Sequence, residues 1–186
     1  MKRGLVERDF VGAAKLIGCD DAAIKAVAEV ESRGAGFLPT GEPKILFERH
    51  IFSRRTGGVY DRIAPDISNK KPGGYGRESE QHARLQKAVA YNRDAALKSA
   101  SWGKFQVMGF NYELAGYNDL QSFINAAYNS EADHLNMFVN YVINVGLSKY
   151  IIAKKWAEFA DGYNGPDYKI NNYDTKMAVA YKKYSK

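Results

Sequence analysis

The feature that most constrains the fold is the helical spacing of apolar residues through most of the 186-residue chain. Apolar residues three or four positions apart indicate a helix with one buried face. A first helix is expected over residues 9–18, and a second, capped by Asp20 or Asp21, to about Ser32. Later helices are expected over 79–98, 101–111, 120–145 with a break near Ser130, 149–162 and 174–184. The chain therefore reads as mostly helical.

One segment interrupts this pattern. Residues 44–52 (KILFERHIF) are rich in β-branched and aromatic residues and predict a strand. Residues 53–77 contain five glycines and two prolines, which predict a loop or hairpin region. We therefore expect an α+β fold in which a small β lobe lies beside a helical lobe. The length suits a single domain over residues 1–186, without a separate binding domain.

Composition excludes several classes of protein. Hydrophobic residues make up 45% of the chain and charged residues 26%, which excludes disorder. Cys19 is the single cysteine, so no disulfide framework is expected. The N-terminus, MKRGLVERDF, lacks the apolar core of an export signal, so we expect a cytoplasmic location. The net charge of +6 is dispersed, which suits weak contact with an anionic envelope better than nucleic-acid binding.

An acid occupies an apolar position at the end of the second helix. Ile24, Val27, Ala28 and Glu31 stand at positions i, i+3, i+4 and i+7, so Glu31 points where a hydrophobic residue belongs. Burial raises the pKa of a carboxyl group, and a neutral carboxyl can donate a proton. The structural alternative is a salt bridge between Glu31 and Arg33 or another base. By pattern alone, Glu31 is either a general acid or a bridged structural residue.

Three ordered motifs carry a resemblance to known enzymes. They are Glu31-Ser32 within VESRG, the run SASWGKFQVMG at residues 99–109, and Tyr163-Asn164 within ADGYNGP. Together they resemble the motifs of goose-type lysozymes and lytic transglycosylases. With ILFERHIF and GGYG added, nearly the whole chain resembles the N-acetylmuramidase domain of phage endolysins. The resemblance implies a lysozyme-like fold, and a glycoside hydrolase that cleaves the β-1,4 bond between N-acetylmuramic acid and N-acetylglucosamine.

The resemblance also implies residue roles. Glu31 matches the general acid of the family, and the remaining matched positions imply substrate contacts at Ser32, Trp102, Gln106, Tyr163 and Asn164. If residues 101–111 are helical, Trp102 and Gln106 lie one turn apart on one face. The alternative for Trp102 is that its side chain is buried and anchors the hydrophobic core. Asn164, followed by Gly165 and Pro166, also reads locally as a helix end followed by a breaker.

Glycoside hydrolysis usually requires a second carboxylate. In an extended strand Glu48 shares a face with His50, so Glu48 is the first candidate for a catalytic base, with His50 as a substrate contact or a bracing partner. Asp66 and then Asp61 are the rivals. The lysine- and glycine-rich run at residues 70–76 reads as a rim of the cleft.

The resulting hypothesis is a muramidase endolysin whose partner is bacterial peptidoglycan. We expect a monomer that waits in the host cytoplasm until lysis and uses no cofactor and no metal, because the sequence has no clustered His, Cys or acid ligands. A lytic transglycosylase that gives 1,6-anhydromuramic products is the alternative within the same class. A non-catalytic module that binds cell wall or nucleic acid is the alternative from another class.

Overall fold

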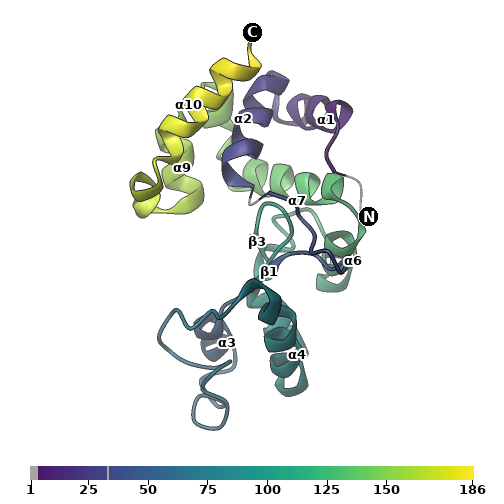
Figure 1. The fold of residues 1–186 in the computed structure, drawn as a ribbon, viewed down its shortest axis with the longest axis vertical. Helices are drawn as coiled ribbons and strands as arrows, with labels where there is room; N and C mark the ends of the chain where they lie inside the picture. Colours follow the sequence, from purple (N-terminus) through teal and green to yellow (C-terminus); the bar gives the residue numbers. More distant parts are fainter. Residues whose placement is uncertain (1–3, 33) are drawn as a thin grey trace.

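The computed structural model describes residues 4–32 and 34–186, and these form two groups of helices with a small sheet between them (Figure 1). The first group contains α1, α2, α7, α9 and α10, and α3 and α4 lie on the other side of the sheet. In chain order, the helices and strands are α1 (Glu7–Ile17), α2 (Asp21–Glu31), β1 (Ile45–Phe47), α3 (Arg49–Arg55), α4 (Gln81–Tyr91), α5 (Arg93–Lys98), β2 (Ala100–Trp102), β3 (Val107–Met108), α6 (Leu120–Asn129), α7 (Glu131–Asn144), α8 (Ser148–Ile152), α9 (Trp156–Asn164) and α10 (Tyr173–Tyr184). Short 3-10 turns cover Glu78–Glu80, Gly109–Asn111 and Pro166–Asn171. The predicted class, mostly helical with a small β element, is confirmed.

Several predicted helix ends are confirmed in detail. The Asp20 side chain accepts a hydrogen bond from the Ala23 amide and caps α2. The long pattern at residues 120–145 breaks at Ser130, whose hydroxyl accepts from the Asp133 amide and so caps α7. Other predicted helices are divided. Residues 79–98 form a 3-10 turn, α4 and α5, because the Asn92 side chain caps a new helix at the Ala95 amide.

The predicted strand at residues 44–52 is mostly wrong. Only Ile45–Phe47 is extended, and α3 starts at Arg49. The chain turns because the amides of Ile51 and Phe52 donate to the Glu48 carbonyl at 3.1 and 3.0 Å. The turn brings the buried Phe52 ring back to the Phe47 ring, with the two ring centroids 5.9 Å apart. Glu48 and His50 therefore do not share a face of a strand; Glu48 is the residue before α3.

The predicted helix at residues 101–111 is also wrong. Residues 100–108 instead form a hairpin, in which β2 pairs antiparallel with both β1 and β3. Gly103 and Gln106 have positive φ angles of 71° and 54°, which close the hairpin turn. The sheet thus takes its second and third strands from this hairpin. A β lobe was expected over residues 53–77, but residues 53–55 end α3 and residues 56–77 form turns and loops.

Aromatic packing joins the hairpin turn to the large helical group. The Phe105 ring stacks on Phe138 of α7 with centroids 4.8 Å apart, and Phe138 contacts Phe159 and Tyr163 of α9 edge to face. Such buried rings supply much of the hydrophobic stabilisation of a small core. The cluster therefore fixes the hairpin turn against α7 and α9. Among the described residues, no helix is both long and apolar enough to span a membrane.

Candidate active site

Glu31 is the last residue of α2 and is only 8% exposed. Ile24, Val27 and Ala28 of the same helix face are also buried, so the predicted apolar stripe with an acid at its end is confirmed. The alternative of a bridged structural acid is not supported by the described residues, since none of their lysines or arginines pairs with Glu31. Arg33, its suggested partner, lies outside the described residues.

Burial raises the pKa of Glu31 from 4.5 to about 7. One contact opposes this shift, because the Asn164 amide donates to Glu31 Oε1 at 2.8 Å and favours the ionised form. Burial is the stronger effect. The Glu31 carboxyl therefore holds a proton close to neutral pH and can release it to an acceptor in the adjoining cavity.

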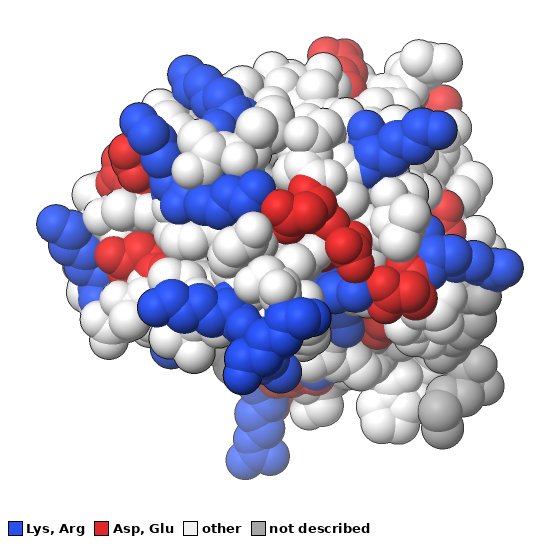
Figure 2. All heavy atoms as spheres, turned by 90° about the horizontal axis from the view of Figure 1, so that it is seen from above, with Lys and Arg blue, Asp and Glu red and all other residues white. Residues whose placement is uncertain are grey.

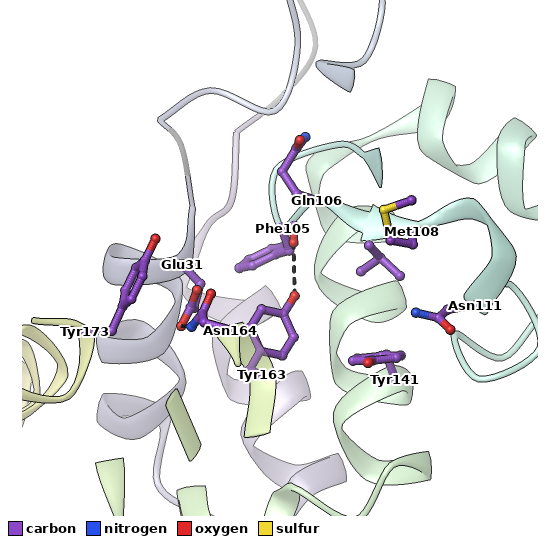
Figure 3. Close-up of a pocket in the computed structure, with 10 residues that line it drawn as sticks. Glu31, Phe105, Gln106, Met108, Asn111, Tyr141, Tyr163, Asn164 and Tyr173 are labelled. Carbon is purple, nitrogen blue, oxygen red and sulfur yellow. Dashed lines mark hydrogen bonds between the residues drawn. The ribbon is translucent and has the colours of Figure 1, made fainter. Parts of the chain in front are cut away.

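A cavity of about 290 Å³ lies against Glu31. Figure 3 shows its wall, to which α2, α7, α9, α10 and the residues at and after the hairpin turn contribute. Polar atoms are prominent in this wall. The lining residues are Glu31, Phe105, Gln106, Val107, Met108, Asn111, Tyr141, Tyr163, Asn164 and Tyr173.

Tyr163 and Asn164 form the side of the cavity contributed by α9. The Tyr163 hydroxyl donates to the Phe105 carbonyl at 3.0 Å, and its ring stacks on Phe159. Burial, followed by the negative charge of Glu31, raises the pKa of Tyr163 well above 10. The hydroxyl therefore remains protonated as a fixed donor. The helix ends at Asn164 with Gly165 at φ 80° and Pro166 beyond it, as the local pattern predicted.

Gln106 lies at the hairpin turn and lines the cavity, but its amide is already engaged. Its Oε1 accepts from the Ser101 hydroxyl, and its Nε2 donates to the Gly103 carbonyl, both at 2.8 Å. These bonds fix the turn that carries Phe105. The predicted helical face shared by Gln106 and Trp102 does not exist, because the segment is a hairpin.

Trp102 does not reach the cavity. Its side chain is 1% exposed, and its indole N–H donates to the Leu97 carbonyl at 3.1 Å. A ring without exposed surface cannot stack on a sugar. The structure therefore corrects the predicted substrate contact at Trp102 in favour of the core anchor.

Ser32 also lies away from the Glu31 cavity. It follows α2 in extended conformation and lines a separate hollow of about 820 Å³ that includes Lys104 and Glu131. The structure thus does not bring Ser32 and Glu31 into the same cavity.

Glu48 and His50 form a second polar site outside the lining of this cavity. Glu48 Oε2 and His50 Nδ1 are 3.2 Å apart, and both atoms are buried. A neighbouring cavity of about 350 Å³, lined in part by Leu46 and Tyr75, shares Gln106 with the Glu31 cavity. Gln106 therefore marks the boundary between the cavity of the acid and the region near the second carboxylate.

The rival carboxylates are engaged elsewhere. Asp61 accepts from the hydroxyls of Ser68 and Ser53 at 2.6 and 3.0 Å, and these bonds hold its pKa below the usual value. Asp66 pairs with Lys87 at 2.8 Å, which lowers its pKa. Both acids hold the loop at residues 57–68 in place, and neither lines the Glu31 cavity.

Sequence reasoning missed several residues of the cavity wall, among them Asn111, Tyr141 and Tyr173. The only signal for the two tyrosines was the high number of this residue, 13 in the chain, and Asn111 had no signal. Which tyrosines line the cavity depends on how the helices pack. For metals, the described part of the chain holds no group of three or more His, Cys, Asp or Glu side chains suited to bind an ion.

The chain is similar to known proteins over almost its whole length. The N-acetylmuramidase family model matches residues 20–185. The crystal structure of the Burkholderia AP3 phage endolysin superposes with a TM-score of 0.93 at 43% sequence identity, over 98% of this chain and 72% of that one. No curated protein matches the chain. Since the family model covers almost the whole sequence, the chain belongs to the N-acetylmuramidase family.

Proposed function

We propose that this chain is a peptidoglycan-degrading endolysin that hydrolyses the β-1,4 bond between N-acetylmuramic acid and N-acetylglucosamine. The observation that carries the proposal is the buried Glu31, whose pKa of about 7 leaves a proton available beside an open cavity. The endolysin with which the chain shares 43% identity supports the same assignment.

In the proposed reaction, Glu31 donates its proton to the glycosidic oxygen while the bond from that oxygen to the anomeric carbon breaks. Water adds to the anomeric carbon and gives up a proton, which Glu48 accepts. The products are a reducing muramic end and a free hydroxyl on the departing sugar. Asn164 stabilises the Glu31 carboxylate that remains, through its 2.8 Å hydrogen bond.

Substrate contacts are proposed at Tyr163, Asn164 and the exposed part of Gln106, because these residues line the Glu31 cavity. Asn111, Tyr141 and Tyr173 join them on the same ground. Tyrosine rings suit this task since each offers an apolar face to a pyranose and a polar edge to its hydroxyls.

One observation favours lytic transglycosylase chemistry as the second candidate. Glu48 does not line the cavity of the acid, and a transglycosylase needs no activated water because the 6-hydroxyl of the muramic residue attacks instead. Mass spectrometry of digested peptidoglycan separates the two reactions. Reducing muramic ends support hydrolysis, and 1,6-anhydromuramic ends support transglycosylation.

A binding module for nucleic acid fits the surface less well. Figure 2 shows one end of the molecule, where lysine and arginine side chains alternate with acidic ones. Phosphate backbones are bound by continuous positive surfaces. The mixed surface and the buried acid at a cavity together favour the enzyme. In the proposed setting, the protein acts on peptidoglycan after leaving the cytoplasm of a bacterial host.

The test of the proposed function is Glu31→Gln, assayed by turbidity loss of cells with exposed peptidoglycan. We expect a roughly 100- to 10,000-fold lower rate, the usual contribution of a general acid. Glu29→Gln is the matched control, because Glu29 belongs to the same helix but pairs with Lys183 at the surface. Retention of full activity by Glu31→Gln would contradict the proposal.

A further inference from the structure

Three segments of the chain meet at one buried carboxylate, the side chain of Glu131 at the start of α7. Glu131 is 6% exposed, and its Oε1 accepts from the Gly36 amide at 2.6 Å. Its Oε2 accepts from the Leu5 amide at 3.3 Å and also lies 3.3 Å from Lys104 Nζ. Glu131 therefore joins the segment before α1, the segment after α2 and the hairpin turn.

Lys104 links the hairpin turn directly to the segment that follows Glu31. Its side chain is 15% exposed, and its Nζ donates to the Gly34 carbonyl at 2.5 Å. The approach is close, since a Cβ atom at Gly36 would lie 3.0 Å from the Lys104 Cβ. Phe105, the next residue, lines the cavity together with Glu31 (Figure 3). Lys104 thus fastens together two stretches of chain that each carry a residue of the cavity wall.

The His134 ring fixes the backbone from which the Lys104 side chain extends. Its Nε2 lies 2.7 Å from the Ala127 carbonyl and donates to it, so Nδ1 is free to accept from the Lys104 amide at 3.1 Å. Burial lowers the pKa of His134 more than the neighbouring acids, Glu131 and Asp133, raise it. The ring is therefore neutral at pH 7 and keeps its bond to the Lys104 amide.

We propose that Lys104 is a positioning residue for Glu31: its bond to Gly34 holds the segment after α2 against the hairpin turn and so keeps water away from the Glu31 carboxyl group. This inference rests on the proposed function, in which Glu31 donates a proton. Without the Lys104 ammonium, the end of α2 can separate from Phe105, and water can reach the carboxyl group.

The direction in which the pKa of Glu31 changes separates this role from two others. Hydration of the carboxyl group would lower its pKa, because water stabilises the ionised form. Loss of a positive charge that acts through space would raise the pKa of Glu31. A purely structural contribution of Lys104 would lower the stability of the protein and leave the pKa of Glu31 unchanged.

The test is Lys104→Met in the full chain, which keeps an apolar stem and removes the ammonium. We expect the pKa of Glu31 to fall by about 1 unit, measured from the pH dependence of its carboxyl ¹³C resonance. Glu31→Gln identifies that resonance by its absence. On soluble, uncrosslinked glycan strands the alkaline limb of the rate profile should move equally, so that kcat at pH 8 falls about 10-fold.

Lys25→Met is the matched control. The Lys25 side chain is 17% exposed and lines the same hollow as Lys104, but its ion pairs are with Glu7 and Asp21. This variant should keep the wild-type pKa of Glu31 and the wild-type rate profile. If Lys104→Met does not fold, Lys104→Gln takes its place with the same expected change, because a glutamine amide carries no charge and is too short to reach Gly34. Thermal unfolding of each variant confirms that folded proteins are compared.

The failures can be told apart. An unchanged or raised pKa of Glu31 in the folded Lys104 variant would overturn the inference, even if activity falls. The same decrease in the folded Lys25→Met variant would overturn it as well. Full activity of Glu31→Gln would instead contradict the proposed function, and the resonance of Glu31 would still show whether Lys104 keeps water from this carboxyl group.

Discussion

Glu31 and Glu48 are the same residue type in two different settings. Glu31 ends α2, where the helix dipole disfavours negative charge. It follows buried apolar residues of the same helix face, and among the described residues Asn164 is its one hydrogen-bond donor. Glu48 precedes α3 and lies among His50 and Tyr75. The comparison teaches that surroundings, more than residue type, divide the proposed work of an acid and a base between two glutamates.

The largest effect expected from the setting of Glu31, compared with that of Glu48, is on the free energy of unfolding. The pKa of Glu31 is raised to about 7 in the folded chain. The contribution of Glu31 to the free energy of unfolding is therefore fully present below pH 4.5 and is lost as the pH rises through 7. Ionisation should cost the wild type roughly 3 kcal/mol by pH 9, following 1.36 kcal/mol per pKa unit. Glu31→Gln should lose none of this, as measured by urea unfolding between pH 5 and pH 9.

The difference between variant and wild type is the quantity to follow, because another buried group changes with pH. Burial lowers the pKa of His134, so its contribution is lost as the pH falls, the opposite direction. That contribution is common to both proteins and cancels in the difference. If the wild type and Glu31→Gln respond alike between pH 5 and pH 7, Glu31 is not desolvated as described.

A smaller effect is expected from Asn164. Its hydrogen bond lowers the pKa of Glu31, so Asn164→Ala should raise that pKa further. The alkaline limb of the rate profile, where the acid loses its proton, should move to higher pH by about one unit or less, with a several-fold lower maximal rate. A shift of this limb to lower pH would contradict the assignment of Asn164 as the donor to the ionised acid.

The smallest effect is expected at Asp66. Its pair with Lys87 is half exposed, and such pairs contribute about 0–1 kcal/mol. Asp66→Asn should therefore retain wild-type activity on peptidoglycan and unfold at nearly the same urea concentration. A loss of activity comparable to that of Glu31→Gln would instead make Asp66 the second catalytic acid and remove Glu48 from that role.

Local patterns predicted the features that depend on one helix and its cap. The burial of Glu31 followed from its spacing to Ile24, Val27 and Ala28. The break at Ser130 followed from its side chain, which accepts a hydrogen bond from the backbone amide three residues later. Both signals lie within about ten residues. They need no knowledge of which helices pack together.

The hairpin at residues 100–108 could not be predicted in this way. Its strands are short, and Ser101 and Trp102 are extended because they pair with Leu46 and Ile45, more than fifty residues earlier. Such tertiary pairing overrides local helical spacing. The same applies to the cavity wall, because Tyr141 and Tyr173 line the cavity beside Glu31 only through the packing of α7 and α10.

Glu31 and Asn164 lie 133 positions apart in the sequence, and this distance along the chain has a consequence for synthesis. A nascent chain that has not yet produced α9 and α10 leaves the second helix uncovered, because α9 supplies the neighbours of Glu31 and Lys183 of α10 binds Glu29. Its acid is then hydrated and gives up its proton at cellular pH. The proposed acid is therefore completed only after α9 and α10 have been synthesised and packed on α2.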